Sequence, residues 1–169
     1  TTLLPSLPDL SIQHLRSVRE VKSLVRDWVA QQALQWPELR AAHLTGGITA
    51  LEDDDLFPAE KDVDLLLIFP DQSAHLLTDA LPLLETQYAG LAIEAGLKPL
   101  TWYRSPAAVL GNPEIAYHLT RDTVLYDPAG QLLALQPEVR RRYAEPGFVQ
   151  ERIAWERRGQ EGAFRLYEQ

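Results

Sequence analysis

Two short stretches of the sequence carry residues whose types and spacing could bind a charged ligand. The first spans residues 44–49 (LTGGIT), and the second spans residues 61–69 (KDVDLLLIF). Side chains alternate across a strand, so Asp62 and Asp64 are expected on one face, about 7 Å apart along the backbone. Carboxylates at this spacing are suited to binding one or two divalent cations.

The glycine pair Gly46-Gly47 could bring the backbone close to an anion. If a helical turn begins there, its free N–H groups face that anion. Taken alone, such a pair is most often an ordinary turn, and an acidic strand end is often simply exposed. In this order, with a strand on each side, the two motifs predict a site for a metal-bound nucleoside triphosphate.

With these motifs, residues 44–126 resemble the DNA polymerase beta-like nucleotidyltransferase superfamily. The similarity is greatest to its small bacterial branch, the aminoglycoside and minimal nucleotidyltransferases. The shared signature is a Gly-Gly or Gly-Ser pair after the first strand, then Asp-x-Asp on the next strand. Gly47 stands where many members have serine, and the loop over residues 48–61 is slightly long.

The resemblance implies transfer of a nucleoside monophosphate from a nucleoside triphosphate, expected to be ATP, with release of pyrophosphate. The acceptor would be a hydroxyl of a small molecule or of a partner protein. Two magnesium ions would be held by Asp62 and Asp64. The phosphates would lie against Gly46 and Gly47. Thr45 or Thr49 could supply the hydroxyl group that serine provides in members with Gly-Ser.

A third carboxylate is expected from the strand predicted over residues 91–98. Its apolar face comprises Leu91, Ile93, Ala95 and Leu97, while Glu94 is the single acid of the segment, on the other face. Members of the superfamily often place a third metal-binding or catalytic carboxylate on this neighbouring strand, which implies that role for Glu94. The competing interpretation is a surface residue paired with Lys98.

Hydrophobic periodicity predicts the elements around these motifs. An amphipathic helix is expected from Ser11 toward Pro37, capped by Ser11 or Asp9. Short strands are expected over residues 41–45 and 123–126, and a helical stretch from Ser73 through Leu84. Further helices are expected at Ser105-Pro106 and Asn112-Pro113, where a capping residue precedes proline, and from Gln131 onward.

The fold class predicted from these elements is α/β (α+β). We expect a small mixed sheet of three to five strands, with helices mainly on one side and a C-terminal helical extension. The nucleotidyltransferase domain is expected over residues 1–135, and the extension over residues 136–169. The metal site is expected at the edge of the sheet, where the strand starting at Asp62 meets the glycine turn.

Composition restricts the partners and the compartment. The chain has 169 residues, no cysteine and a net charge of -8, so a long nucleic-acid footprint and a thiolate metal site are both excluded. No apolar run has the length of a membrane span, and no basic segment leads into an apolar one at the N-terminus. A cytoplasmic protein without a membrane partner is therefore expected.

Two other functions remain open. The protein could be a catalytically inactive nucleotide-binding or interaction module on the same fold, which Gly47 in the serine position and the uncertain role of Glu94 both allow. A metal-dependent hydrolase is a weaker alternative, because the histidines His14, His43, His75 and His118 have no ligand spacing. Convergence of Asp62, Asp64 and Glu94 in space would favour the transferase.

Overall fold

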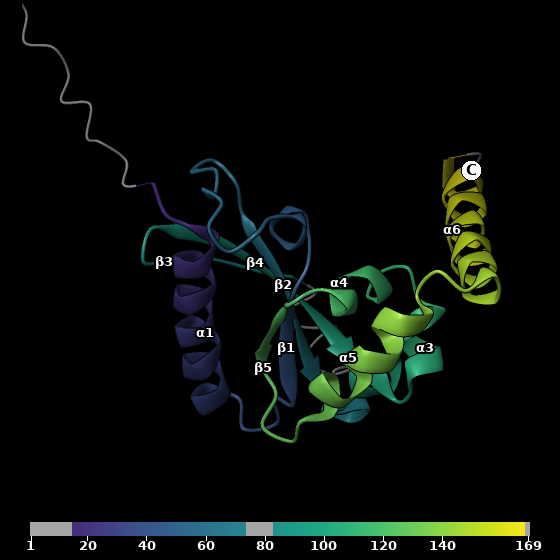
Figure 1. Ribbon diagram of the computed structural model, residues 1–169, viewed down its shortest axis with the longest axis horizontal. Helices are drawn as coiled ribbons and strands as arrows, with labels where there is room; N and C mark the ends of the chain where they lie inside the picture. The colour runs from purple at the N-terminus through teal and green to yellow at the C-terminus, as the bar shows by residue number, and fades with distance from the viewer. Residues whose placement is uncertain (1–14, 74–82, 168–169) are drawn as a thin grey trace, which may run out of the picture.

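Five strands form one mixed sheet in the computed structural model, which describes residues 15–73 and 83–167 (Figure 1). The spatial order of the strands is β3-β4-β2-β1-β5. Their bounds are β1 Ala41–Leu44, β2 Val63–Phe69, β3 Leu83–Tyr88, β4 Leu91–Pro99 and β5 Val124–Tyr126. Only β2 and β4 pair in parallel, and the other neighbours are antiparallel. The predicted α/β class with a small mixed sheet is confirmed.

Strand β2 lies at the centre of the sheet and is covered on both faces. Leu65 and Leu67 pack on one side, in a cluster with helix α1, while Leu66 and Ile68 pack on the other side with later helices. This explains why the sequence of β2 after Asp64 is apolar without alternation. Asp64 shares the face of Leu66 and Ile68, because side chains two residues apart point the same way.

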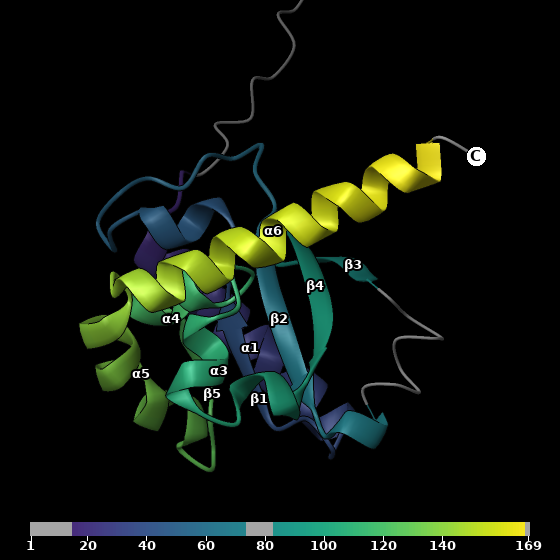
Figure 2. The same cartoon turned by 90° about the vertical axis from the view of Figure 1, so that its right-hand side faces the viewer.

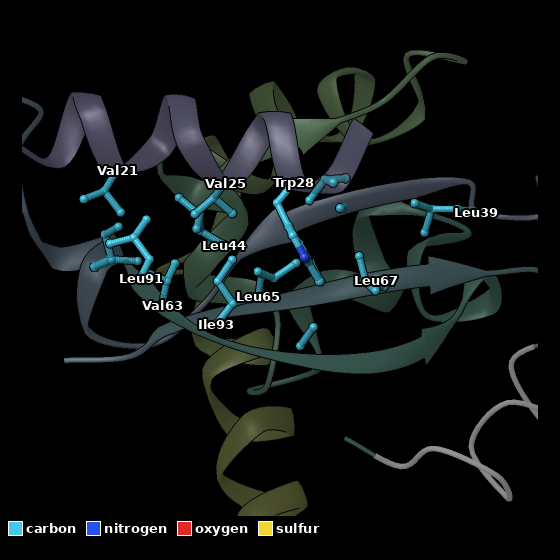
Figure 3. Close-up of a cluster of buried hydrophobic side chains, with 14 of the residues drawn as sticks. Val21, Val25, Trp28, Leu39, Leu44, Val63, Leu65, Leu67, Leu91 and Ile93 are labelled. Carbon is cyan, nitrogen blue, oxygen red and sulfur yellow. The ribbon is translucent and has the colours of Figure 1, made fainter. Parts of the chain in front are cut away.

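Helix α1, Val18–Gln35, covers one face of the sheet (Figures 1 and 3). The predicted cap at Ser11 or Asp9 is wrong, because Ser17 caps the helix in a capping box. Ser17 Oγ accepts from the backbone N–H of Glu20 at 3.2 Å, and Glu20 Oε2 accepts from the Ser17 N–H at 2.8 Å. The motif Ser-x-x-Glu at residues 17–20 therefore starts the helix. Asp9, Ser11 and His14 themselves lie outside the described residues.

Most of the helices lie on the opposite face of the sheet, as expected. They are α3 Pro106–Leu110, α4 Ala116–Thr120 and α5 Gln131–Arg142, joined to β4 through a 3-10 turn, η2, at Leu100–Tyr103. Ser105 caps α3 as predicted, accepting from the Ala108 N–H at 3.1 Å. The second short helix is present as α4, but its predicted start at Asn112-Pro113 is wrong, because Asn112 Oδ1 accepts from the Glu114 N–H in a turn and the helix begins at Ala116.

The segment before β4 differs from its prediction. Leu83 and Leu84 were expected to end a helix that begins at Ser73, but they begin β3, which pairs with β4 as a hairpin. Gly90, with φ +79°, lies in the connecting turn, a conformation that favours glycine. Pairing along the edge of the sheet outweighs the local helical pattern here. Residues 74–82, with His75, lie outside the described part of the chain.

The C-terminal region is helical, as predicted. Helix α6, Pro146–Tyr167, is held near its start by Arg152, which donates to the carbonyls of Leu110 at 2.8 Å and Tyr143 at 2.7 Å. Its C-terminal part extends away from the sheet (Figure 2). The boundary expected after residue 135 falls inside α5, where Leu132 and Val139 are buried in one cluster. No helix within the described residues combines the length and apolarity needed to cross a membrane.

Candidate active site

The glycine turn packs directly against the acidic strand. After β1, Gly46 adopts φ +67° and ψ -160° and precedes a one-turn 3-10 helix, η1, at Gly47–Ala50. A Cβ atom at residue 46 would lie 2.2 Å from Asp64 Oδ2, whereas one at Gly47 would meet no atom within 4 Å. Position 46 therefore requires glycine twice, for its backbone conformation and for the space that the Asp64 carboxylate fills.

The two threonines of the motif have different surroundings. Thr45 donates its backbone N–H to the Asp64 carbonyl at 2.9 Å and borders the cleft described below. Thr49 is buried, and its hydroxyl donates to the Gly46 carbonyl at 2.7 Å. Thr49 therefore stabilises the turn from within, and of the two hydroxyls that of Thr45 is the one placed to meet a ligand.

The sheet aligns acidic residues on neighbouring strands. Asp64 on β2 is the register partner of Glu94 on β4, and Glu94 is in turn the partner of Glu85 on β3. Side chains of paired residues share a face, and neighbouring strands lie about 4.8 Å apart. Asp62 is exposed and precedes β2. The sequence analysis missed Glu85, because its segment was predicted to follow a helix and the pairing of β3 is a tertiary feature.

The pKa values of this row respond to burial and to mutual repulsion. Loss of solvation raises the pKa of Asp64, the Asp62 carboxylate raises it further, and Lys61 opposes the effect. Desolvation likewise raises the pKa of Glu94, with added repulsion from Asp64, Glu85 and Asp62. The carboxylates therefore lie close enough to disfavour each other's charged form, which a bound cation would relieve.

The donor set fits magnesium in its chemistry, because all of these groups are carboxylate oxygens. In the described part of the chain, however, no group of three histidine, aspartate or glutamate side chains is arranged to enclose a metal ion. Asp64 and Glu94 could instead hold a magnesium ion whose other ligands are phosphate oxygens and water, the usual arrangement for this metal. The role of Asp62 as a further ligand of the metal remains a prediction.

A cleft of about 470 Å³ opens over these carboxylates. Asp64, Glu94, Thr45 and Gly46 border one part of it, and Lys98, Glu114 and His118 border the rest. Gly96 also lines it, where a Cβ would lie 3.0 Å from Leu66 Cδ2. Leu66 therefore packs closely against Gly96, which leaves little space for a larger side chain at residue 96.

Lys98 does not pair with Glu94, so the competing interpretation of Glu94 as its partner is wrong. The Lys98 ammonium lies 3.1 Å from Glu114 Oε2 and 4.4 Å above the Trp102 ring centroid. Glu114 and Trp102 follow β4 in the chain and come from the helical layer over the sheet. Within the described residues, Glu94 therefore lies beside Asp64 without an ion-pair partner.

One histidine of the scattered set also reaches the cleft. His118 on α4 borders it, burial lowers its pKa, and its Nδ1 atom is buried without a hydrogen-bond partner among the described residues. No spacing in the sequence connects His118 to Asp64. Only the packing of α4 on the sheet brings the two residues to one cleft.

No protein-family model matches this sequence, and no curated protein matches it. Among solved structures, the chain is similar to a nucleotidyltransferase-like protein from Exiguobacterium sibiricum 255-15, with a TM-score of 0.46 and 18% sequence identity. The similarity covers 74% of this chain and 40% of that protein, so this chain spans less than half of the other's length.

Proposed function

We propose that the protein is a metal-dependent nucleotidyltransferase that moves a nucleoside monophosphate from a nucleoside triphosphate to a hydroxyl group. The observation that carries the proposal is the contact between the Gly46 turn and the Asp64 carboxylate, with Glu94 in register beside it. This arrangement places backbone suited to a phosphate next to carboxylates suited to a cation. Each group alone is common, and their direct contact is what favours this function.

In the proposed reaction, the acceptor oxygen forms a bond to the α-phosphorus and the bond from that phosphorus to the β-phosphate bridging oxygen breaks. The products are the modified acceptor and pyrophosphate. Glu94 would take the proton of the acceptor hydroxyl, because it borders the cleft in register beside Asp64. The backbone at Thr45 and Gly46, which borders the cleft beside Asp64, would lie against the phosphates.

Asp64 and Glu94 would hold magnesium together with phosphate oxygens and water, and Asp62 is proposed as a further ligand from its exposed position before β2. When bound, magnesium would neutralise the phosphate charge and lower the pKa of the attacking hydroxyl. Without a cation, Asp64 and Glu94 repel the phosphates, so nucleotide and metal are expected to bind together. Thr45 would contribute its hydroxyl at the mouth of the turn, and Thr49 would keep the turn in shape.

The acceptor is proposed to be a small hydroxylated molecule or a few residues of a partner protein, with ATP as the donor. The net charge of -8 opposes binding of a long nucleic acid, which requires a basic surface. The cleft of about 470 Å³ has room for a small acceptor group beside the carboxylates.

The direct test is release of pyrophosphate from labelled nucleoside triphosphates, with magnesium and a panel of hydroxylated acceptors. We expect the wild type to transfer the nucleotide. Transfer should be lower by orders of magnitude in Glu94→Gln and close to that of the wild type in Glu85→Gln. Glu85 is the matched control, since it pairs with Glu94 but is exposed on the edge strand. Equal activity of wild type and Glu94→Gln would contradict the proposal.

A non-catalytic nucleotide-binding module is the second candidate. It is favoured by the exposure of Asp62 and by the lack of three converging metal ligands among the described residues. Such a module would bind magnesium and ATP without releasing pyrophosphate under any acceptor condition. Binding measured beside turnover therefore distinguishes the two functions.

A further inference from the structure

An arginine that does not line the cleft holds the glycine turn in place. Arg121, which follows α4, donates from Nε to the Thr49 carbonyl at 3.0 Å and from Nη2 to Glu52 Oε1 at 2.8 Å. Thr49 and Glu52 lie in η1 and just after it. The carbonyls at the end of a helical turn lack intrahelical partners, and a guanidinium there satisfies one of them with a charged donor.

We propose that Arg121 is a positioning residue for nucleotide binding, acting through Thr49 on Gly46. The inference rests on the proposed function, because it assigns Arg121 to the turn that would receive the phosphates. A continuous set of contacts carries it. Arg121 holds the Thr49 carbonyl, the Thr49 hydroxyl holds the Gly46 carbonyl at 2.7 Å, and Gly46 packs against Asp64.

The backbone that carries Arg121 is itself fixed to α5. The Arg121 carbonyl accepts from Gln136 Nε2 at 2.8 Å and from the Thr123 N–H at 3.0 Å, and Gln136 is buried. The position of a turn near residue 46 therefore depends on a helix about ninety residues later in the chain.

The two contacts of Arg121 contribute differently. The ion pair with Glu52 joins side chains that are 35% and 77% exposed, so water and salt screen it strongly. The contact with the Thr49 carbonyl is part-buried and directly fixes the backbone. The hydrogen bond from Arg121 Nε to the Thr49 carbonyl is therefore expected to stabilise the turn, and Glu52→Gln should affect the turn little.

The test compares Arg121→Gln with Arg140→Gln, which removes the same charge from an arginine bound to the adjacent carbonyl but not to the turn. Hydrogen exchange is measured at the Thr49 and Leu51 amides, which donate within the turn. In Arg121→Gln their exchange should quicken about tenfold or more, the expected effect of losing a charged hydrogen bond. Exchange in the β2–β4 ladder should not change, whereas a general loss of stability would quicken both.

Nucleotide binding provides the second measurement. We expect the Kd of magnesium-ATP, and the KM for the nucleotide in transfer, to rise about tenfold in Arg121→Gln, with kcat and the acceptor KM changed much less. Arg140→Gln should match the wild type in both. Unchanged exchange, or faster exchange in the turn with unchanged nucleotide affinity, would overturn the inference.

Two further comparisons keep these results separable. If Arg121→Gln does not fold, Arg121→Lys is measured in its place. It keeps the charge but cannot make both contacts at once, so the changes should be smaller and in the same direction. If the wild type binds nucleotide but transfers nothing, the proposed transferase activity fails while exchange and affinity still decide the role of Arg121.

Discussion

Gly46 and Asp64 form the contact on which the candidate site depends most directly. One has no side chain, and the other places its carboxylate in the space that a side chain would fill. The consequences of substitution at these two positions differ in kind. A change at Asp64 alters charge with little change of shape, while a change at Gly46 alters shape with no change of charge.

Replacing Asp64 by asparagine should lower transfer activity by orders of magnitude and leave the metal-free protein as stable as wild type, or more stable, at pH 7. The pKa of Asp64 is raised in the folded state, so the native protein binds more protons than the unfolded chain above pH 3.8, the ordinary value. Stability is therefore lost as pH rises through that window. Asp64→Asn does not lose stability in this way, so any excess stability over the wild type should vanish below pH 3.8.

Chemical denaturation at several pH values, beside a transfer assay, measures both effects. Asp54→Asn is a suitable control, since Asp54 is 93% exposed and pairs with Arg19 at the surface. Wild-type activity in Asp64→Asn would refute its assigned role. So would unfolding of the metal-free variant, which would indicate a structural carboxylate.

Replacing Gly46 by alanine should destabilise the protein by about 1–3 kcal/mol from its backbone conformation alone, and more if the Asp64 carboxylate cannot move. Activity should fall further than the folded fraction, because the turn and Asp64 shift together. Gly47→Ala is the matched control, with open space around its added methyl group. Equal behaviour of the two variants in unfolding and transfer assays would contradict the described contact.

At the level of elements, β1 joins the two apolar clusters and leads into the glycine turn. Ala42 and Leu44 face α1, while Ala41 faces the helices on the other side. His43 is fully buried on the side of the later helices, with Nε2 2.7 Å from the Tyr103 hydroxyl and Nδ1 2.9 Å from the Leu44 carbonyl. The strand that positions the turn therefore contains a buried titratable group.

Stability should fall by roughly 2 kcal/mol between pH 7 and pH 5 because of His43. Burial lowers the pKa of His43 to about 4 from 6.5, so the unfolded chain binds more protons than the native protein between these values. Stability is then lost as pH decreases through that range. Denaturation of His43→Gln at both pH values should show a smaller difference, and His118→Gln should remove part of the remainder, since its pKa is also lowered. An unchanged pH dependence in His43→Gln would refute this account.

For the whole molecule, the site lies where the sheet meets its helical layer. Strands β2 and β4 supply Asp64 and Glu94, and the segments after β4 supply His118 and Glu114, the ion-pair partner of Lys98. The net charge of -8 makes the molecule repel free nucleotide. A cation bound between the carboxylates and the phosphates is therefore expected to control the affinity for the nucleotide.

Magnesium with ATP should raise the melting temperature more than ATP alone. A ligand at one hundred times its Kd stabilises by about 2.7 kcal/mol, which corresponds to about 5–10 °C for a protein of this size. Asp64→Asn should lose most of the difference between the two conditions, and EDTA should abolish it in the wild type. Equal shifts with and without magnesium would count against a metal-bound nucleotide.

The amino-acid sequence by itself was enough to identify the local elements whose signals lie within a few residues. The alternation in β4, the continuous apolar run of β2 and the cap of α3 at Ser105 were all predicted, because burial on one or two faces leaves a direct pattern in the sequence. The α/β class follows from the same patterns. The capping box at Ser17 is also visible in the sequence, although the predicted cap lies at Ser11 or Asp9.

Only the tertiary structure decided which residues meet. Leu83 and Leu84 became a strand because the free edge of β4 was available to pair with them, a gain that no local window contains. The same pairing placed Glu85 beside Glu94. Packing of the later helices on the sheet brought His118 to the cleft and Arg121 to the turn. The contact between Arg121 and Thr49 joins residues about seventy positions apart. The energy of such a contact depends on chain closure and packing, so it leaves no periodic signal in the sequence.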